Sequence, residues 1–141
     1  MPDLERTTDP EVIRSVFARA EVFPFVVTGG HPATWQPQFN EGIHWLAAPG
    51  AVFLTYPSSG VLWEMHAASV AKGKTAEYAR QFFDYLRDNT NCRHVIAVIT
   101  ETNLKAIKRA ESVGMRLEGI FPDSRIVNEQ LVGALVYGKG I

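Results

Sequence analysis

The segment that most constrains the fold runs from Val61 to Thr100, where two apolar stretches flank a helical pattern. The first stretch, Val61–Ser69, passes through a short loop into a helix whose apolar residues recur on one face at Ala79, Phe82, Phe83 and Leu86. The second stretch, Val95–Ile99, is continuously apolar, which is typical of a strand buried on both faces. A strand–helix–strand unit of this kind predicts a parallel strand pair joined by a right-handed crossover.

The loop ahead of this helix, Ala71–Lys74, combines a glycine with two lysines. Gly73 can adopt a positive φ and lets the backbone approach a phosphate closely. The N–H groups of a first helical turn lack intrahelical partners and carry the positive end of the helix dipole. We expect Thr75 to be the N-cap, with Glu77 in the first turn. The pattern predicts an anion site, although strand-to-helix junctions with a glycine also occur without a ligand.

The N-terminal half predicts one helix and a group of antiparallel strands. After a short edge strand at Leu4–Arg6, Thr8 or Asp9 caps a helix with Pro10 in its first turn. We expect the apolar face of this helix to comprise Val12, Ile13, Val16, Phe17 and Ala20. Short turns then separate three strands, which must be antiparallel neighbours. In order, these strands and turns are His44–Ala48, Pro49-Gly50, Ala51–Tyr56, Pro57–Gly60 and Val61–Ser69.

The C-terminal half adds a second helix and two strands. Thr102 or Asn103 caps the helix Leu104–Val113, which ends at Gly114. The predicted strands are Met115–Phe121, closed by Pro122-Asp123, and Leu131–Tyr137, with Asn128-Glu129 near the reversal between them. Together the elements predict an α/β fold with a mixed, mostly antiparallel sheet of about six or seven strands, flanked by helices.

Composition narrows the class of protein. A chain of 141 residues is expected to form one domain, residues 1–141, with a single core. The formal net charge of −1 argues against a general nucleic-acid binder. Cys92 is the only cysteine, so a reducing, cytoplasmic location is the default and we expect the thiol to be structural. The sequence contains no long apolar run and no signal-peptide pattern, and we expect neither a membrane partner nor a metal ion.

Two further sets of residues are candidates for catalysis or for substrate binding. Glu64 and His66 lie two positions apart on a predicted strand and therefore share a face, which is either catalytic or simply solvated with a structural histidine. The stretch Thr28–Gly42 is rich in Gly and Pro and contains Trp35 and Phe39. Large aromatic residues in such a loop pack either on the protein's own core or on a ligand, so both are candidates for substrate binding.

The segment from Asn103 to Gly119 strongly resembles the second helix and following strand of the GCN5-related N-acetyltransferases, the GNAT superfamily. The matching residues are Asn103, Ala106, Ala110-Glu111, Gly114-Met115 and Glu118-Gly119. The resemblance is greatest to the branch of the ribosomal-protein N-terminal acetyltransferases. Some phage-encoded members also share a Gly-Lys-x-Ala loop, which here is Gly73–Ala76. With this loop included, the resemblance covers roughly residues 61–137.

The resemblance implies that the two parallel strands splay apart and hold acyl-CoA, here acetyl-CoA, in the opening. The pyrophosphate would rest on the N–H groups of Lys72, Gly73, Lys74, Thr75 and Ala76. Strand backbone at His66–Val70, including Ala68 and Val70, would pair with the pantetheine arm. Asn103 would hydrogen-bond the same arm, and the candidate phosphate partners are Lys72, Lys74 and Lys105.

The implied reaction is attack of a neutral primary amine on the thioester carbonyl. The acceptor stays open: it is a small molecule, a protein N-terminus or a lysine. Glu64 is the first candidate for the base that removes the amine's proton, and His66 is the second because imidazole titrates near neutral pH. A backbone N–H near Val70 would polarise the thioester oxygen. A homodimer is compatible with this assignment.

The sequence departs from the family at two places. The usual loop pattern, Gln/Arg-x-x-Gly-x-Gly/Ala, corresponds here to Val70, Gly73 and Thr75, so only the central glycine matches. The tyrosine that many members use as general acid is replaced by Ala110. Both departures are also compatible with a non-catalytic acyl-CoA-binding module, or with a structural or assembly protein such as a component of a phage particle.

Overall fold

The computed structural model describes residues 3–27 and 29–141, so the first two residues and Thr28 of the Gly- and Pro-rich stretch lie outside the description. The helices and strands follow in the order β1 (Glu5–Arg6), α1 (Pro10–Phe17), α2 (Phe23–Val26), β2 (His44–Ala48), β3 (Ala51–Ser59), β4 (Leu62–Ser69), α3 (Thr75–Asn89), β5 (His94–Thr100), α4 (Leu104–Ser112), β6 (Arg116–Val127) and β7 (Gln130–Gly140).

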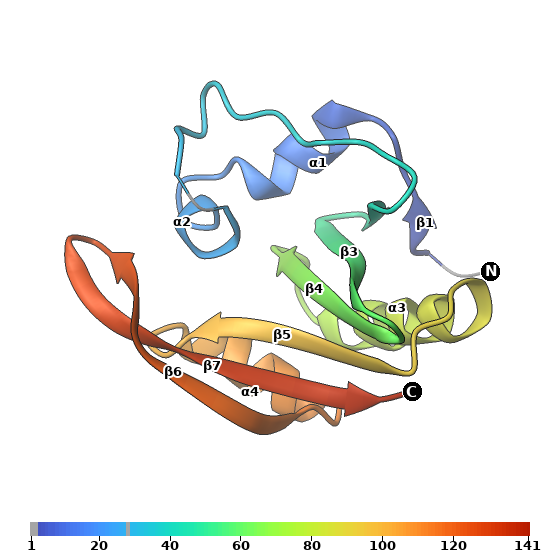
Figure 1. Ribbon diagram of the computed structural model, residues 1–141. Helices are drawn as coiled ribbons and strands as arrows, with labels where there is room; N and C mark the ends of the chain where they lie inside the picture. Colours follow the sequence, from blue (N-terminus) through green and yellow to red (C-terminus); the bar gives the residue numbers. More distant parts are fainter. Residues whose placement is uncertain (1–2, 28) are drawn as a thin grey trace.

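The strands form one mixed sheet of seven strands in the order β1-β2-β3-β4-β5-β7-β6. Only β4 and β5 pair in parallel, and every other described pair is antiparallel. Figure 1 shows α1 and α2 on one face of the sheet and α3 and α4 on the other. The predicted fold class and the predicted parallel neighbours are therefore confirmed.

The main core lies between the sheet and α3. The four apolar residues that predicted the inner face of this helix, Ala79, Phe82, Phe83 and Leu86, are all buried. The ring of Phe82 stacks on Phe53 of β3 at a centroid distance of 4.9 Å. Burying a side chain of this size contributes about 1.5–3 kcal/mol to folding. The helix that joins the parallel strands is therefore fixed against the sheet by its own periodicity.

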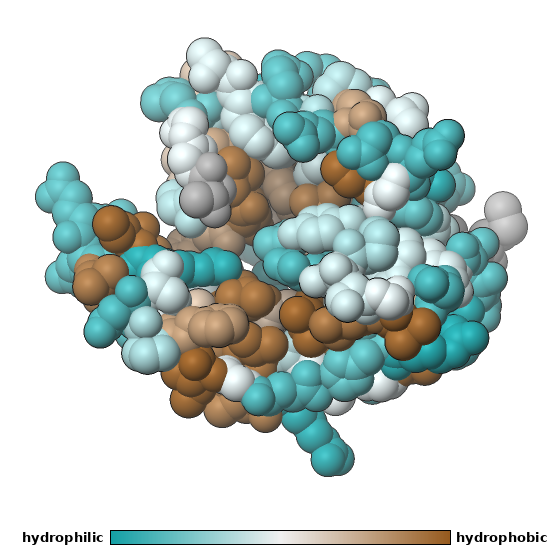
Figure 2. Space-filling model, viewed as in Figure 1, coloured by the Kyte–Doolittle hydropathy of each residue, from teal (hydrophilic) through white to brown (hydrophobic). Residues whose placement is uncertain are grey.

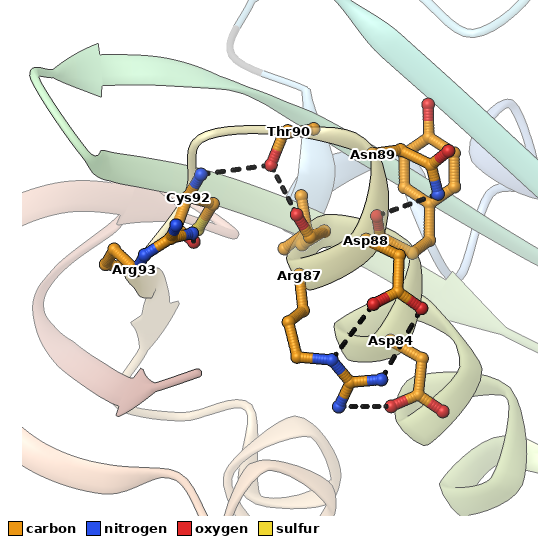
Figure 3. Close-up of polar contacts among 9 residues, drawn as sticks. Asp84, Arg87, Asp88, Asn89, Thr90, Cys92 and Arg93 are labelled. Carbon is orange, nitrogen blue, oxygen red and sulfur yellow. Dashed lines mark hydrogen bonds and ion pairs between the residues drawn. The ribbon is translucent and has the colours of Figure 1, made fainter.

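Side-chain hydrogen bonds hold the turn from α3 into β5 (Figure 3). The hydroxyl of Thr90 donates to the carbonyl of Leu86 at 2.6 Å and accepts from the N–H of Cys92 at 3.1 Å. Near the end of the helix, Arg87 lies between Asp84 and Asp88 and pairs with both. Cys92 is fully buried, and burial raises the pKa of its thiol, which agrees with a structural role.

On the opposite face, α1 packs over β2, β3 and β4. Asp9 caps this helix by accepting from the N–H of Glu11 at 3.0 Å, one of the two predicted caps. Its buried face is narrower than predicted, because Ala20 lies beyond the end of the helix and is exposed, and Val12 is 38% exposed. The helix is only two turns long, so it covers the β2–β4 half of the sheet and leaves β5, β7 and β6 uncovered on this face.

This uncovered half corrects a prediction for β5. Val95, Ala97 and Ile99 are buried against α3 and α4, but Ile96 and Val98 on the other face are only half-buried. The continuous apolar run therefore predicted burial on both faces wrongly. The reason is that no helix of the described residues covers this strand from the α1 and α2 side.

Two predicted turns also proved to be strand. β3 continues through Pro57 to Ser59, with a bulge, and reverses at Gly60. β6 runs through Pro122, where the register with β7 shifts and Asp123 adopts a φ of 49°. A bulge accommodates a proline that has no N–H for the ladder, so neither Pro residue ends its strand. Among the described residues, no helix has the length and apolar character needed to cross a membrane.

Candidate functional site

The candidate site lies where β4 and β5 separate. β4 pairs with β3 as far as Ser69, but its pairing with β5 ends at Glu64 and Ile96. Beyond that point the two strands diverge (Figure 1), and a cavity of about 120 Å³ opens between them, which we call the central cleft. Its walls come from β4, β5, α2, α3 and α4. Figure 2 shows the hollow between the two halves of the molecule, with hydrophobic side chains on its walls.

Beyond Glu64, the edge of β4 that faces the central cleft has no partner strand. The N–H of Val70 donates to the carbonyl of Gly50 at 2.7 Å and therefore points toward β3. The carbonyl of Ser69 points the other way, where Nη1 of Arg109 on α4 donates to it at 3.3 Å. Strand residues alternate, so the N–H of Ala67 also points toward the cleft. The thioester-polarising role expected near Val70 consequently fits Ala67 better, because the Val70 N–H is engaged within the sheet.

The basic loop at the end of β4 keeps its N–H donors free. Gly73 has a φ of 75°, and no atom of the described residues, apart from Gly73 and its two chain neighbours, lies within 4 Å of the position that a Cβ would occupy there. The N–H groups of Lys72, Gly73 and Lys74 donate to no acceptor within residues 3–27 and 29–141. Lys72 and Lys74 are exposed and form no ion pair with the described residues. The loop thus has the open backbone that an anion requires.

The N-cap of α3 differs from the prediction. Lys74 occupies the cap position without a side-chain hydrogen bond, and Thr75 is the first helical residue. The hydroxyl of Thr75 donates backward to the carbonyl of Ala71 at 3.1 Å and contacts the hydroxyl of Ser69 at 2.8 Å. Because this hydroxyl satisfies the loop and not the helix, the first-turn N–H groups, including that of Ala76, remain available to a ligand.

On the other side of the cleft, α4 contributes the residues that carried the resemblance. Asn103 caps this helix by accepting from the N–H of Ala106 at 3.3 Å, and it lines the cleft. Its carboxamide Nδ2 donates to no described residue, so it can still hydrogen-bond a ligand. Lys105 is exposed on the first turn. Ala110, which stands where many members have a tyrosine, is buried and lines the cleft without offering a hydroxyl.

The two candidate bases lie together, and a third residue joins them. Oε1 of Glu64 is 3.4 Å from Nε2 of His66, so the predicted shared face is confirmed. The hydroxyl of Tyr56 lies 3.0 Å from the same nitrogen, and the two rings stack at a centroid distance of 5.9 Å. Of this trio, only His66 lines the central cleft. Sequence reasoning missed Tyr56, although the register of the β3–β4 hairpin, which pairs Tyr56 with Glu64, is the signal that finds it.

The environment sets the protonation of this trio. Burial lowers the pKa of His66, and the positive charge of Arg125 lowers it further, while Glu64 opposes both. Burial and the nearby Glu64 carboxylate raise the pKa of Tyr56 to about 12. At neutral pH the site therefore contains a neutral imidazole and a protonated phenol. The Nδ1 atom of His66 has no hydrogen-bond partner among the described residues, so it is the ring nitrogen available to a ligand.

A second residue that sequence reasoning missed is Arg125. From β6 its guanidinium reaches across β7 to β5, where it donates to the hydroxyl of Thr100 at 3.1 Å and to the carbonyl of Val98 at 3.4 Å. Both acceptors belong to residues that line the central cleft. Only the bulge in β6, which no local pattern predicts, gives Arg125 this register.

The structure treats the two aromatic candidates differently. Trp35 packs on the protein's own core, with its ring 6.1 Å from Phe17 and 6.4 Å from Trp45. Trp35 also lines a second space of about 640 Å³, the aromatic hollow, which is bordered by Trp45, Leu54 and Tyr56. Phe39 is 43% exposed and lines neither space. The structure therefore brings Trp35, but not Phe39, toward the trio.

No protein-family model and no curated protein matches this sequence. Solved structures do match. Smu.2055 from Streptococcus mutans UA159 aligns with a TM-score of 0.80 and 16% identity over 97% of this chain and 98% of that one. A ribosomal-protein-alanine N-acetyltransferase from Brucella melitensis aligns with a TM-score of 0.64 and 15% identity, over 72% and 70% of the two chains. YncA from Salmonella typhimurium, solved with its cofactor acetyl-CoA, aligns with a TM-score of 0.61 and 13% identity, over 70% of this chain and 65% of that one. The chain therefore has the fold of the GCN5-related N-acetyltransferases, as the segment from Asn103 to Gly119 predicted.

Proposed function

We propose that the protein is an N-acetyltransferase that moves an acetyl group from acetyl-CoA to a primary amine. One observation carries the proposal: the cleft that is lined by the neutral His66 is also lined by Ser69 and Thr75, which flank a loop with free N–H donors. An anionic, elongated thioester fits such a cleft, because its phosphates and its reactive end need different environments. The acetyl-CoA named for yncA agrees with this choice.

The cleft offers separate groups for the parts of acetyl-CoA. The N–H groups of Lys72–Ala76 would hold the pyrophosphate, with Lys72 and Lys74 adding positive charge and Lys105 within the neighbouring helix turn. The unpaired edge of β4 around Ala67 and the free Nδ2 of Asn103 would hydrogen-bond the pantetheine arm. Acetyl-CoA supplies the activated acyl group and a thiolate that leaves readily. The N–H of Ala67 would polarise the thioester oxygen.

The proton of the amine is the main chemical problem. At pH 7 a lysine with a pKa near 10.4 costs about 4.6 kcal/mol to deprotonate, and an α-amine near 7.7 costs about 1 kcal/mol. We assign the proton to Nδ1 of His66, because His66 lines the cleft and its lowered pKa keeps it neutral. Glu64 then stabilises the imidazolium through Nε2, and Tyr56 holds the ring in place. This order reverses the sequence-based preference for Glu64.

Two measurements test the proposal. Acetyl-CoA at a hundred times its Kd is expected to stabilise the folded protein by about 2.7 kcal/mol. A panel of amines and N-terminal peptides is then offered with acetyl-CoA, and release of free thiol is followed. Stabilisation together with amine-dependent thiol release supports the transferase. The absence of stabilisation at millimolar acetyl-CoA contradicts it.

A second candidate function is favoured by two residues of α4. Ala110 offers no hydroxyl where many members have a general acid, and Arg109 donates to the Ser69 carbonyl that a pantetheine arm would use. Both fit a protein that binds acyl-CoA without turnover, or a structural protein, such as a phage particle component, that binds none. Stabilisation without thiol release identifies the first of these, and no stabilisation identifies the second.

A further inference from the structure

The inference concerns Arg125, a cation held by two residues that line the central cleft, as His66 does. Its two hydrogen bonds, to Thr100 Oγ1 and to the Val98 carbonyl, fix the guanidinium against the β5 wall of the central cleft. Both acceptors are neutral, and the remaining donors of the planar fork have no partner among the described residues. Arg125 thus has a fixed position and free donors against a wall of the same cleft that His66 lines.

No carboxylate of the described residues serves as a counterion for Arg125. Arg125 takes part in no ion pair among residues 3–27 and 29–141, although it is half-buried. Its charge is near enough to lower the pKa of His66. A half-buried charge without a partner is unfavourable, and a cation next to a general base weakens that base. Both costs disappear if a bound anion pairs with Arg125, and a guanidinium is well shaped to bind a carboxylate through two hydrogen bonds.

The aromatic hollow lies next to the central cleft and has an uncharged lining. It meets the central cleft at Val26, which lines both, and at the hydrogen bond between Tyr56 and His66. Its walls are aromatic, aliphatic or carboxamide side chains, and none of the described lining residues carries a formal charge. A polycationic amine would lose its hydration there without meeting a carboxylate, so the hollow fits an uncharged group.

We propose that the acceptor is a free amino acid with an uncharged side chain, whose carboxylate binds Arg125 and whose side chain lies in the aromatic hollow. The proposal rests on the proposed function and names its acceptor class. In the reaction, the amine nitrogen bonds to the acetyl carbon and gives its proton to His66. The carbon–sulfur bond breaks, and the thiolate takes up a proton to give CoA and an N-acetylamino acid.

The test compares three probes that differ in charge: phenylalanine, phenylalaninamide and spermidine. Thiol release is measured with acetyl-CoA, and the shift in melting temperature is measured for each probe in the presence of CoA. We expect phenylalanine to be preferred over its amide by at least about tenfold in kcat/KM, because a charged hydrogen bond is lost with the carboxylate. Phenylalanine alone is expected to raise the melting temperature of the CoA complex.

Variants on β6 assign the preference to one side chain. Arg125→Gln is expected to raise KM for phenylalanine by at least about tenfold and to leave the amide nearly unaffected, while Arg125→Lys recovers part of the loss. Arg116→Gln, an exposed arginine on the same strand, is the matched control and should change nothing. Circular dichroism, together with the increase in melting temperature caused by acetyl-CoA, verifies that each variant is folded.

The possible outcomes distinguish a failure of this proposal from a failure of the proposed acetyltransferase function. Three results would overturn the proposal that the acceptor is a free amino acid. They are equal rates with phenylalanine and phenylalaninamide, a preference for spermidine or for peptide N-termini, and a preference for phenylalanine over its amide that is unchanged in Arg125→Gln. If no amine releases thiol, the transferase fails, but the melting shift still decides the subsite. Stabilisation by phenylalanine that is lost in Arg125→Gln supports it, and no stabilisation refutes it.

Discussion

The hydroxyl of Tyr56 lies 3.0 Å from Nε2 of His66, on the same ring nitrogen that faces Glu64 at 3.4 Å. Because burial and Glu64 raise the pKa of Tyr56 to about 12, the phenol stays protonated and is placed to donate to the carboxylate. The hydrogen-bond network then assigns the imidazole proton to Nε2. Nδ1 is left as the acceptor, and His66 is the member of the trio that lines the cleft. The roles that we propose for the three side chains rest on this contact.

The first prediction tests the proposed roles of His66 as the general base and of Glu64 as the charge that stabilises its imidazolium. His66→Gln is expected to lower turnover at pH 7 by about a hundred- to ten-thousand-fold, the usual effect of losing a general base. Glu64→Gln keeps the ring but removes the charge that stabilises the imidazolium, so its loss should be smaller. Neither change should alter acetyl-CoA affinity measured by calorimetry. The deficit of His66→Gln should shrink as the pH rises, because the amine then deprotonates itself.

The opposite ranking would reverse the assignment. If Glu64→Gln carries the large deficit and His66→Gln does not, Glu64 is the base and His66 its partner. If turnover survives both substitutions, the proton leaves by another route, such as water, and the trio is structural.

The second prediction concerns the loop that we propose as the binding site of the phosphates. Gly73→Glu places a carboxylate where the N–H donors are free, so it should abolish stabilisation by acetyl-CoA. Gly60→Glu is the matched control: this glycine also has a positive φ and open space, but it lies in the turn between β3 and β4. Both variants carry similar backbone strain, so melting curves with and without acetyl-CoA isolate the ligand effect. Loss of the shift in both variants, or in neither, would count against the loop.

The third prediction concerns the core that holds α3 under the cleft. Phe82 is fully buried and stacks on Phe53, so Phe82→Ala should reduce the free energy of unfolding by about 3–5 kcal/mol. Leu104→Ala on α4 serves as the control, because Leu104 is 65% exposed and its loss should change stability by less than about 0.5 kcal/mol. Urea unfolding measures both. Similar losses in the two variants would mean that the core is not where the structure places it.

The elements that sequence predicts well are those specified by neighbouring residues. The inner face of α3 follows from the spacing of Phe82, Phe83 and Leu86, and the parallel strand pair follows from the crossover that α3 provides. The caps Asp9 and Asn103 are local too, since a short side chain binds N–H groups two or three residues ahead.

The site depends on residues that are distant in the sequence. Tyr56 reaches His66 only through the register of the β3–β4 hairpin, and Arg125 reaches Thr100 only because β6 bulges after Phe121 and crosses β7. The prediction that Thr75 caps α3 was wrong, because its hydroxyl donates to the carbonyl of Ala71 and not to the helix. Residue spacing alone does not reveal this alternative hydrogen bond. Local patterns therefore predicted the position of the cleft, whereas the side chains that we propose as its reactive groups are identified only by the three-dimensional arrangement.

The last prediction is a pH dependence of stability that originates in the same histidine. The pKa of His66 in the folded state is lowered, first by burial and also by Arg125, below the value near 6.5 of an unfolded chain. When the folded pKa is the lower one, the unfolded state binds the proton more readily, so stability is present above about pH 6.5 and is lost as the pH falls toward the folded pKa. His44, whose pKa is lowered by burial and by Arg6, contributes in the same direction.

The free energy of unfolding is therefore expected to decrease between about pH 7.5 and about pH 5.5. His66→Gln, which cannot take up the proton, should lose less stability over this interval than the unmodified protein, and His44→Gln should remove the separate contribution of the other ring. Urea unfolding at the two pH values measures each difference. An unchanged pH dependence in His66→Gln would show that the ring is not desolvated, and the neutral imidazole on which the proposed mechanism depends would lose its physical basis.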